Sequence, residues 1–195
     1  MSFRIVALGA VAAMSLSACT VNNNAAPANS QSADGAMGNG MMGNESSLSA
    51  ADIMFLQMMI PHHEQAIDMS KLAITNTKNA EVLDLAARIE AAQQPEIDLM
   101  KKLLSDAGQA EMPGHSMGDN GMMTEANMAA LAAAKDNSFD LLYLTGMIGH
   151  HNGAISMASA VSDSPNSDVK TLATNIVNSQ TAEIAEMMKL APGAS

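Results

Sequence analysis

Two histidine doublets, each accompanied by methionines, are the residues with the clearest potential for chemistry. The doublets His62-His63 and His150-His151 contain four of the five histidines in the chain. In each copy, one methionine precedes the first histidine by three residues and another follows it by seven. Imidazole nitrogen and thioether sulfur are ligands that soft metal ions such as Cu(I) prefer. The two sets are Met59, His62, His63 and Met69, and Met147, His150, His151 and Met157.

The doublets belong to an internal repeat. Residues 52–69 recur as residues 140–157, and residues 85–100 recur as residues 172–187. Apolar residues in these blocks are spaced three and four apart, which is typical of amphipathic helices. A single hairpin of two such helices cannot bury its own apolar face. We therefore predict an all-α fold in which two repeated hairpins pack into a four-helix bundle with pseudo-two-fold symmetry.

The helical period places the doublets on the buried side of this bundle. On a helix of 3.6 residues per turn, His62 and His63 flank the apolar stripe and Glu64 faces water. The small residues Ala66 and Ala154 leave room beside the rings. A single buried histidine is often only a hydrogen-bonded core residue, and this alternative stays open. Because both halves repeat the pattern, metal binding is the favoured interpretation.

The second helix of each hairpin carries a further pair of polar residues. These are Gln93 with Glu96, and Gln180 with Glu183. Their oxygens could bind a metal ion directly or could accept hydrogen bonds from the histidine N–H groups. The residue types leave both roles open.

Four other residues in the predicted helices have structural interpretations. We expect Asp52 and Asp140 to begin helices rather than to bind metal. Pro61 and Pro95 fall inside helices and should bend them or leave carbonyl groups unpaired.

A third group of soft ligands lies in the loop between the repeats, residues 108–123. Glycine and proline interrupt this segment, so we expect no packed helix there. Core packing would not account for its thioethers, which could capture Cu(I) weakly and reversibly. The alternative is drift in a low-complexity segment. The candidate ligands are Met112, His115, Met117, Met122 and Met123.

The N-terminal segment is expected to be processed. Residues 1–18 resemble a bacterial lipoprotein signal peptide, with Arg4 before an apolar run and small residues before Cys19. Cys19 would then carry the lipid that anchors the protein to the cell envelope, outside the cytoplasm. A plain secretory signal is the alternative. Residues 19–47 are predicted to form a flexible linker that contains further methionines.

Charge narrows the classes of partner. The chain has 20 acidic residues against 9 lysines and arginines, which disfavours nucleic acid and favours cations. Its one cysteine excludes a disulfide within the chain. No nucleophile–base motif, phosphate loop or dinucleotide fingerprint is present, so we expect no catalysis. Imidazole-based binding should fade below about pH 6, where free histidine protonates.

The doubled motif Met-Ile-x-His-His-x-x-Ala-Ile-x-Met, followed in each half by Gln-x-x-Glu-Ile, resembles the domain-of-unknown-function 305 family. This family includes CopM-type periplasmic copper-binding proteins. The resemblance covers residues 48–191: repeat one (48–107), the Met/His-rich loop (108–123) and repeat two (124–191). It implies a ferritin-like bundle outside the cytoplasm that binds Cu(I), Cu(II) or Ag(I) in copper tolerance. The implied ligands are the two histidines and two methionines of each motif.

These observations predict a lipid-anchored copper-binding protein that sequesters or transfers metal. Its partners would be copper ions, the membrane through Cys19, and copper donor or acceptor proteins. Thioether sulfur also binds Ag(I) and imidazole also binds Zn(II), so silver and zinc are further candidate ions. Two alternatives remain open: a ferritin-like metal-dependent oxidase, and a cell-envelope interaction protein that binds no metal.

Overall fold

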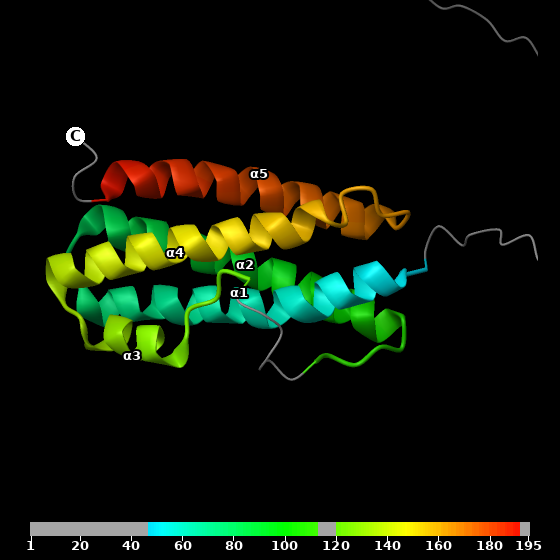
Figure 1. The fold of residues 1–195 in the computed structure, drawn as a ribbon, viewed down its shortest axis with the longest axis horizontal. Coiled ribbons are helices and arrows are strands. Elements are labelled where there is room, and N and C mark those ends of the chain that lie inside the picture. The colour runs from blue at the N-terminus through cyan, green and yellow to red at the C-terminus, as the bar shows by residue number, and fades with distance from the viewer. Residues whose placement is uncertain (1–46, 113–119, 192–195) are drawn as a thin grey trace, which may run out of the picture. The chain divides into compact units, whose positions relative to one another are not determined.

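A computed structural model describes residues 47–112 and 120–191. The predicted signal peptide, Cys19 and nearly all of the predicted linker lie outside these residues. None of the described helices is long and apolar enough to cross a membrane. The described residues form five helices and no strands (Figure 1). The helices are α1 (Ala50–Asn76), α2 (Ala80–Asp106), α3 (Glu125–Ala133), α4 (Asp136–Ser159) and α5 (Ser167–Leu190).

The four long helices form the predicted bundle. Helices α1 and α2 pack as one hairpin and α4 and α5 as the other, and the hairpins meet mainly along α1 and α4 (Figure 1). The short helix α3 is an addition that the repeat does not predict. It contacts α1 and α4 and buries Leu131 completely. The Asn76 side chain donates hydrogen bonds to the carbonyl groups of Leu131 and Ala132, which fixes α3 against the end of α1.

Local sequence explains where the helices begin. Ser49 and Asp52 form a reciprocal capping box: the Asp52 N–H donates to Ser49 Oγ, and the Ser49 N–H donates to Asp52 Oδ2. The expectation for Asp140 is wrong, because α4 already begins at Asp136 and Asp140 lies one turn inside it. Asp140 instead accepts a hydrogen bond from the Asn79 side chain across the bundle.

The two internal prolines do not interrupt their helices. Helix α1 runs without a break through Pro61, and α2 runs without a break through Pro95. Short connections, residues 77–79 and 160–166, separate the helices of each hairpin. The doublets therefore lie in the middle of long, continuous helices.

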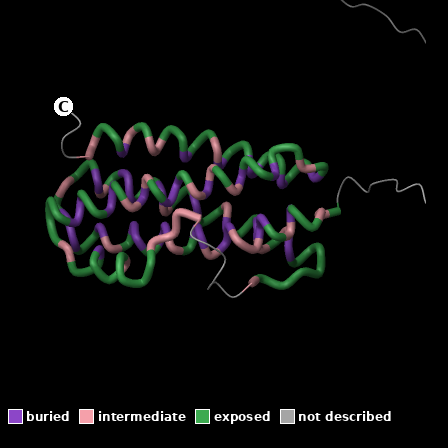
Figure 2. The backbone as a smooth tube through the Cα atoms, in the orientation of Figure 1, coloured by how far each residue is buried: buried purple, intermediate pink, exposed green. Residues whose placement is uncertain are grey.

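Buried residues recur along the four long helices (Figure 2). The apolar ones form two clusters that the doublets separate along α1 and α4. The first cluster contains Met59 and Met100. The second contains their repeat equivalents, Met147 and Met187, together with Met69. Because equivalent residues lie in opposite clusters, the repeats are related by a pseudo-two-fold axis that passes between the clusters. The histidines occupy the region around this axis.

The capping box gives a test of the fold. We expect Ser49→Ala to lower the free energy of unfolding by about 1 kcal/mol, because the first turn of α1 loses a hydrogen-bond acceptor for its N–H groups. Urea denaturation followed by circular dichroism measures this change. The matched control is Ser105→Ala, an exposed position near the end of α2, which should have little effect. Equal stabilities for the two variants would contradict the role of Ser49.

Candidate metal centre

The structure brings the two doublets together in the seam between α1 and α4. All four histidines are at most 1% exposed. The ring centroids of His62 and His150 are 3.7 Å apart, with the ring planes tilted by 43°. Within each doublet the centroids are 6.5 and 6.4 Å apart. The four rings therefore form one buried group at the pseudo-two-fold axis.

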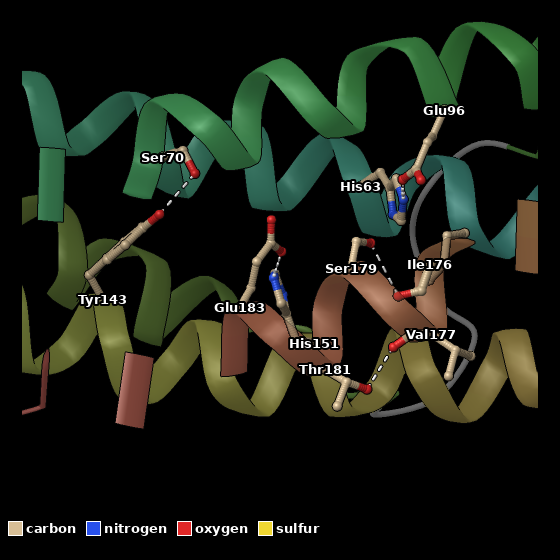
Figure 3. Close-up of polar contacts among 10 residues, drawn as sticks. All are labelled: His63, Ser70, Glu96, Tyr143, His151, Ile176, Val177, Ser179, Thr181 and Glu183. Carbon is tan, nitrogen blue, oxygen red and sulfur yellow. Dashed lines mark hydrogen bonds and ion pairs between the residues drawn. The ribbon is translucent and has the colours of Figure 1, made fainter. Parts of the chain in front are cut away.

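The second histidine of each doublet, which we call the outer ring, is held by a carboxylate from the neighbouring helix (Figure 3). His63 Nε2 lies 2.9 Å from Glu96 Oε2, and His151 Nε2 lies 2.7 Å from Glu183 Oε2. An ionised carboxylate only accepts hydrogen bonds, so Nε2 carries the proton in each ring. The lone pair is then on Nδ1, which is buried and has no hydrogen-bond partner in either ring. This is the arrangement that prepares a histidine to bind a metal ion through its other nitrogen.

The first histidines of the two doublets, which we call the inner rings, differ in their hydrogen bonds. His62 Nε2 donates a hydrogen bond to the backbone carbonyl of Asn120 at 2.9 Å, and its Nδ1 has no partner. Neither ring nitrogen of His150 has a partner that meets hydrogen-bond geometry. Although His62 and His150 are equivalent in the repeat, only His62 has a fixed proton position.

Burial controls the charge of the inner rings. Desolvation lowers the pKa of His62 to about 3; the hydrogen bond to the Asn120 carbonyl opposes this shift, and the charges of His63 and His151 act in the same direction as burial. Desolvation also lowers the pKa of His150 well below its ordinary value. The expectation that imidazole protonates near pH 6 is therefore wrong for these two rings. Both stay neutral, with a lone pair available for a metal ion.

The glutamines one helical turn before Glu96 and Glu183 lack partners as well. Gln93 and Gln180 are buried, and both polar atoms of each side-chain amide have no hydrogen bond. The two glutamates accept hydrogen bonds from histidines, which is the second of the two roles that the sequence left open. Buried polar atoms in proteins are nearly always paired. The ring nitrogens and amides without partners are therefore the groups to which a further ligand could bind.

Thioethers lie on both sides of the histidine group along the bundle. Met59, Met69 and Met147 are fully buried in the two core clusters, and Met157 is half-buried against the first. Met100 and Met187, from α2 and α5, belong to the same clusters. Each end of the histidine group thus faces a cluster that contains methionine.

The loop residues divide into two groups. His115 and Met117 lie outside the described residues. Met112, Met122 and Met123 are half-buried. The expectation that core packing would not account for the loop thioethers is wrong for Met123, which packs against the second core cluster. The missing side chain of Gly146 makes room for it, since a Cβ there would lie 3.0 Å from Met123 Sδ.

A glycine face on α4 is a feature that the motif did not indicate. Residues 120–123 lie against this face and also contact α1 through His62 and Gln65. Glycine weakens a helix interior, so several glycines in one helix are a sequence signal for close approach of another segment. The glycines are Gly146, Gly149 and Gly153, where the first repeat has Met58, Pro61 and Gln65.

The donor set limits the kind of metal site. Within residues 47–112 and 120–191, no group of three or more histidine, cysteine, aspartate or glutamate side chains is arranged to hold a metal ion. A di-iron oxidase site would require clustered carboxylates and paired Glu-x-x-His motifs. A centre in this seam must therefore be built from few imidazole nitrogens, with sulfur as the other available donor.

Comparison with known proteins gives one family. The chain matches the model of the family described as Domain of unknown function (DUF305) over residues 52–191. A curated relative, uncharacterized protein L153 of Acanthamoeba polyphaga mimivirus, is 42% identical over 55 residues, which cover 28% of this chain and 36% of the relative. The chain thus spans about a third of the length of that relative.

Solved structures resemble the bundle over most of its length. A DUF305 fragment from Deinococcus radiodurans has a TM-score of 0.69 and 28% identity, covering 74% of this chain and 97% of that chain. A DUF305 protein from Streptomyces coelicolor, described as a candidate secreted protein, has a TM-score of 0.68 and 31% identity, covering 72% and 89%. CopM in the Cu(I)-bound form has a TM-score of 0.61 and 32% identity, covering 71% and 93%. Because the family match includes both doublets and most of the chain, the protein belongs to the DUF305 family.

Proposed function

We propose that this protein binds copper as its cargo in the seam between α1 and α4, with ligands drawn from the buried histidines and from the methionines of the adjoining clusters. In this proposal, the protein sequesters copper or passes it on, and needs no catalytic group of its own. The observation that carries the proposal is the set of buried ring nitrogens without hydrogen bonds. Leaving such groups unpaired is costly in a folded protein, and a bound metal ion would remove that cost.

The hydrogen bonds of the outer rings indicate how the ion would be held. Glu96 and Glu183 keep the proton on Nε2 and turn a lone pair on Nδ1 toward the protein interior. A carboxylate behind a ligating histidine also makes the ring a stronger donor. We infer that His63 and His151 bind through Nδ1, with the glutamates as supporting groups rather than ligands.

The choice of copper follows from the surrounding donors. Buried methionines such as Met59 and Met147 offer neutral sulfur, which selects Cu(I) and Ag(I). Imidazole extends the range to Cu(II). Zn(II) is less suited, because zinc sites in proteins use thiolate, imidazole and carboxylate ligands and not the thioether sulfur of methionine. The solved structures of CopM with Cu(I), with Cu(II) and with Ag bound support the same choice.

The sulfur atoms of the connecting segment would serve capture rather than storage. Met112 and Met122 are half-buried in the connecting segment and lie outside both core clusters. Together with His115 and Met117, they would provide weak sites that exchange ions readily. Met123 is better placed as part of the core, so we do not include it among the freely exchanging ligands.

We further propose that the protein works outside the cytoplasm, attached to the cell envelope by a lipid on Cys19. The lipobox-like sequence before Cys19 supports this proposal. So does the similarity to a Streptomyces coelicolor protein described as a candidate secreted protein. A flexible linker would then hold the bundle near the membrane, where copper donor or acceptor proteins could reach it.

Removing one doublet tests the site. We expect His62→Ala combined with His63→Ala to weaken Cu(I) binding by residues 20–195 at least tenfold, or to remove one bound ion, because two imidazole donors are lost. Competition with a colorimetric Cu(I) chelator measures both quantities. Asn152→Ala is the matched control, since Asn152 is exposed on α4 and bonds only within its helix. Unchanged Cu(I) binding in the doublet variant would remove these histidines from the site.

Substitution of Glu96 tests whether this carboxylate supports His63 or binds the ion itself. We expect Glu96→Ala to weaken Cu(I) affinity about tenfold to hundredfold without changing the number of bound ions, because His63 loses the partner of its Nε2–H group. The same chelator competition gives affinity and stoichiometry. Asp98→Ala, which removes an exposed carboxylate from the same helix, should bind as the unsubstituted protein does. Loss of a whole bound ion in the Glu96 variant would instead make Glu96 a ligand.

The buried rings also predict how the stability of the metal-free protein depends on pH. In the unfolded chain His62 and His150 protonate near pH 6.5, whereas in the folded protein burial lowers the pKa of His62 to about 3 and that of His150 well below its ordinary value. The unfolded state therefore binds more protons between these values, and stability falls as pH decreases from 6.5 toward 3. Urea midpoints measured between about pH 7 and pH 4 should fall, and fall less steeply for His62→Gln. The same pH slope in both proteins would contradict the assignment.

A further inference from the structure

Residues 120–123 form a strap that crosses the seam between α1 and α4 (Figure 1). On the α1 side, the Gln65 side chain binds both backbone groups of Met123. Its Nε2 donates to the Met123 carbonyl at 2.9 Å, and its Oε1 accepts from the Met123 N–H at 2.7 Å. At the other end of the strap, the Asn120 carbonyl accepts the hydrogen bond from His62 Nε2. Helix α1 therefore holds the strap at both ends.

On the α4 side, the strap lies directly on the helix backbone. A Cβ at Gly153 would lie 1.6 Å from the Asn120 oxygen and 2.4 Å from its carbonyl carbon. The strap itself needs glycine as well, because Gly121 has φ of +81° and a Cβ there would lie 2.4 Å from the Gly149 oxygen. These contacts are with backbone atoms, which cannot rotate away as a side chain can. Only glycine at position 153 lets Asn120 reach its observed place.

The two positions that hold the strap are equivalent in the repeat. Gln65 and Gly153 occupy the same place in the two halves. One contributes hydrogen bonds to the strap and the other contributes space. His62 and His150 are likewise equivalent, and only His62 receives the strap carbonyl. The difference between the repeats at this position thus accompanies the difference between the two inner histidines.

We propose that Gly153 is a positioning residue for the copper centre. By admitting Asn120 against α4, it places the carbonyl that keeps the proton of His62 on Nε2 and leaves the Nδ1 lone pair for the ion. His150, whose ring nitrogens make no hydrogen bond of good geometry, remains able to bind through either nitrogen. The two halves of the centre therefore differ: a hydrogen bond fixes the tautomer of His62, and none fixes that of His150. This inference rests on the proposed copper binding.

Two glycine substitutions on the same helix separate this role from a general effect on α4. Gly153→Ala places its methyl group into the Asn120 backbone, whereas Gly149→Ala meets nothing within 4 Å. Both changes add one methyl group and favour helix to the same degree. In the metal-free protein, ¹⁵N NMR of labelled histidine should show the Nε2–H tautomer of His62 in the unsubstituted protein and in Gly149→Ala. Gly153→Ala should lose this fixed tautomer.

Copper binding gives the second readout. Chelator competition with Cu(I) should show affinity about tenfold to hundredfold weaker for Gly153→Ala and unchanged for Gly149→Ala, as expected when a ligating histidine loses its partner. Gln65→Ala releases the strap without adding bulk and should act in the same direction, so it replaces Gly153→Ala if that variant does not fold. The proposal is overturned if Gly153→Ala or Gln65→Ala keeps both the His62 tautomer and the affinity. Equal effects of the two glycine changes would also overturn it.

The two readouts separate this inference from the proposed function. If the unsubstituted protein binds no Cu(I), the proposed function fails, while the tautomer of His62 in the metal-free protein still reports whether the strap positions the ring. If Cu(I) binds normally in every variant but the tautomer changes only in Gly153→Ala, the strap orients His62 without contributing to the copper centre. That result would overturn the positioning role and leave copper binding intact.

Discussion

Removing an imidazole ring from water favours its neutral form, and burial in this bundle lowers the pKa of His62 and of His150. Glu96, Glu183 and the Asn120 carbonyl each accept one N–H group, which leaves lone pairs inside the protein with nothing to accept. The long helices and their apolar clusters have to hold this polar group in place without the help of water. A soft cation is a natural counterpart, because it binds to neutral nitrogen and sulfur and does not require a buried negative charge.

The apolar clusters on either side of the histidines explain how the protein tolerates this arrangement. Each cluster combines residues from both hairpins, so the hairpins are joined by apolar contacts on both sides of the histidines as well as at the rings of His62 and His150. Apolar burial in these clusters offsets the unfavourable placement of polar atoms between them. The histidine group is therefore held in place without an ion, and under the proposed copper binding this would lower the cost of binding.

The sequence predicts those parts of the fold that follow from period and repetition. Helical spacing and the duplicated motif predict the two hairpins and the inward doublets, because apolar stripes must meet. Helix α3 is not predictable in this way, since its alanine-rich sequence buries only Leu131 completely and shows no clear stripe. The role of Glu96 is not predictable from the sequence either, because a carboxylate three residues from Gln93 can reach a metal or a histidine equally well. The contact of Asn120 with Gly153 joins residues that no spacing rule connects.

The pseudo-two-fold axis has a consequence for how such a protein can have arisen. If two identical hairpins associated as a homodimer, every residue near the axis would face its own copy, and both copies would carry the same side chain. A segment that crosses the axis would then need a glutamine for its hydrogen bonds and a glycine for its space at one and the same sequence position. Joining the hairpins in a single polypeptide lifts this requirement, so that Gln65 and Gly153 can diverge. Covalent fusion thus allows an internally duplicated protein to break its own symmetry at the centre of the molecule.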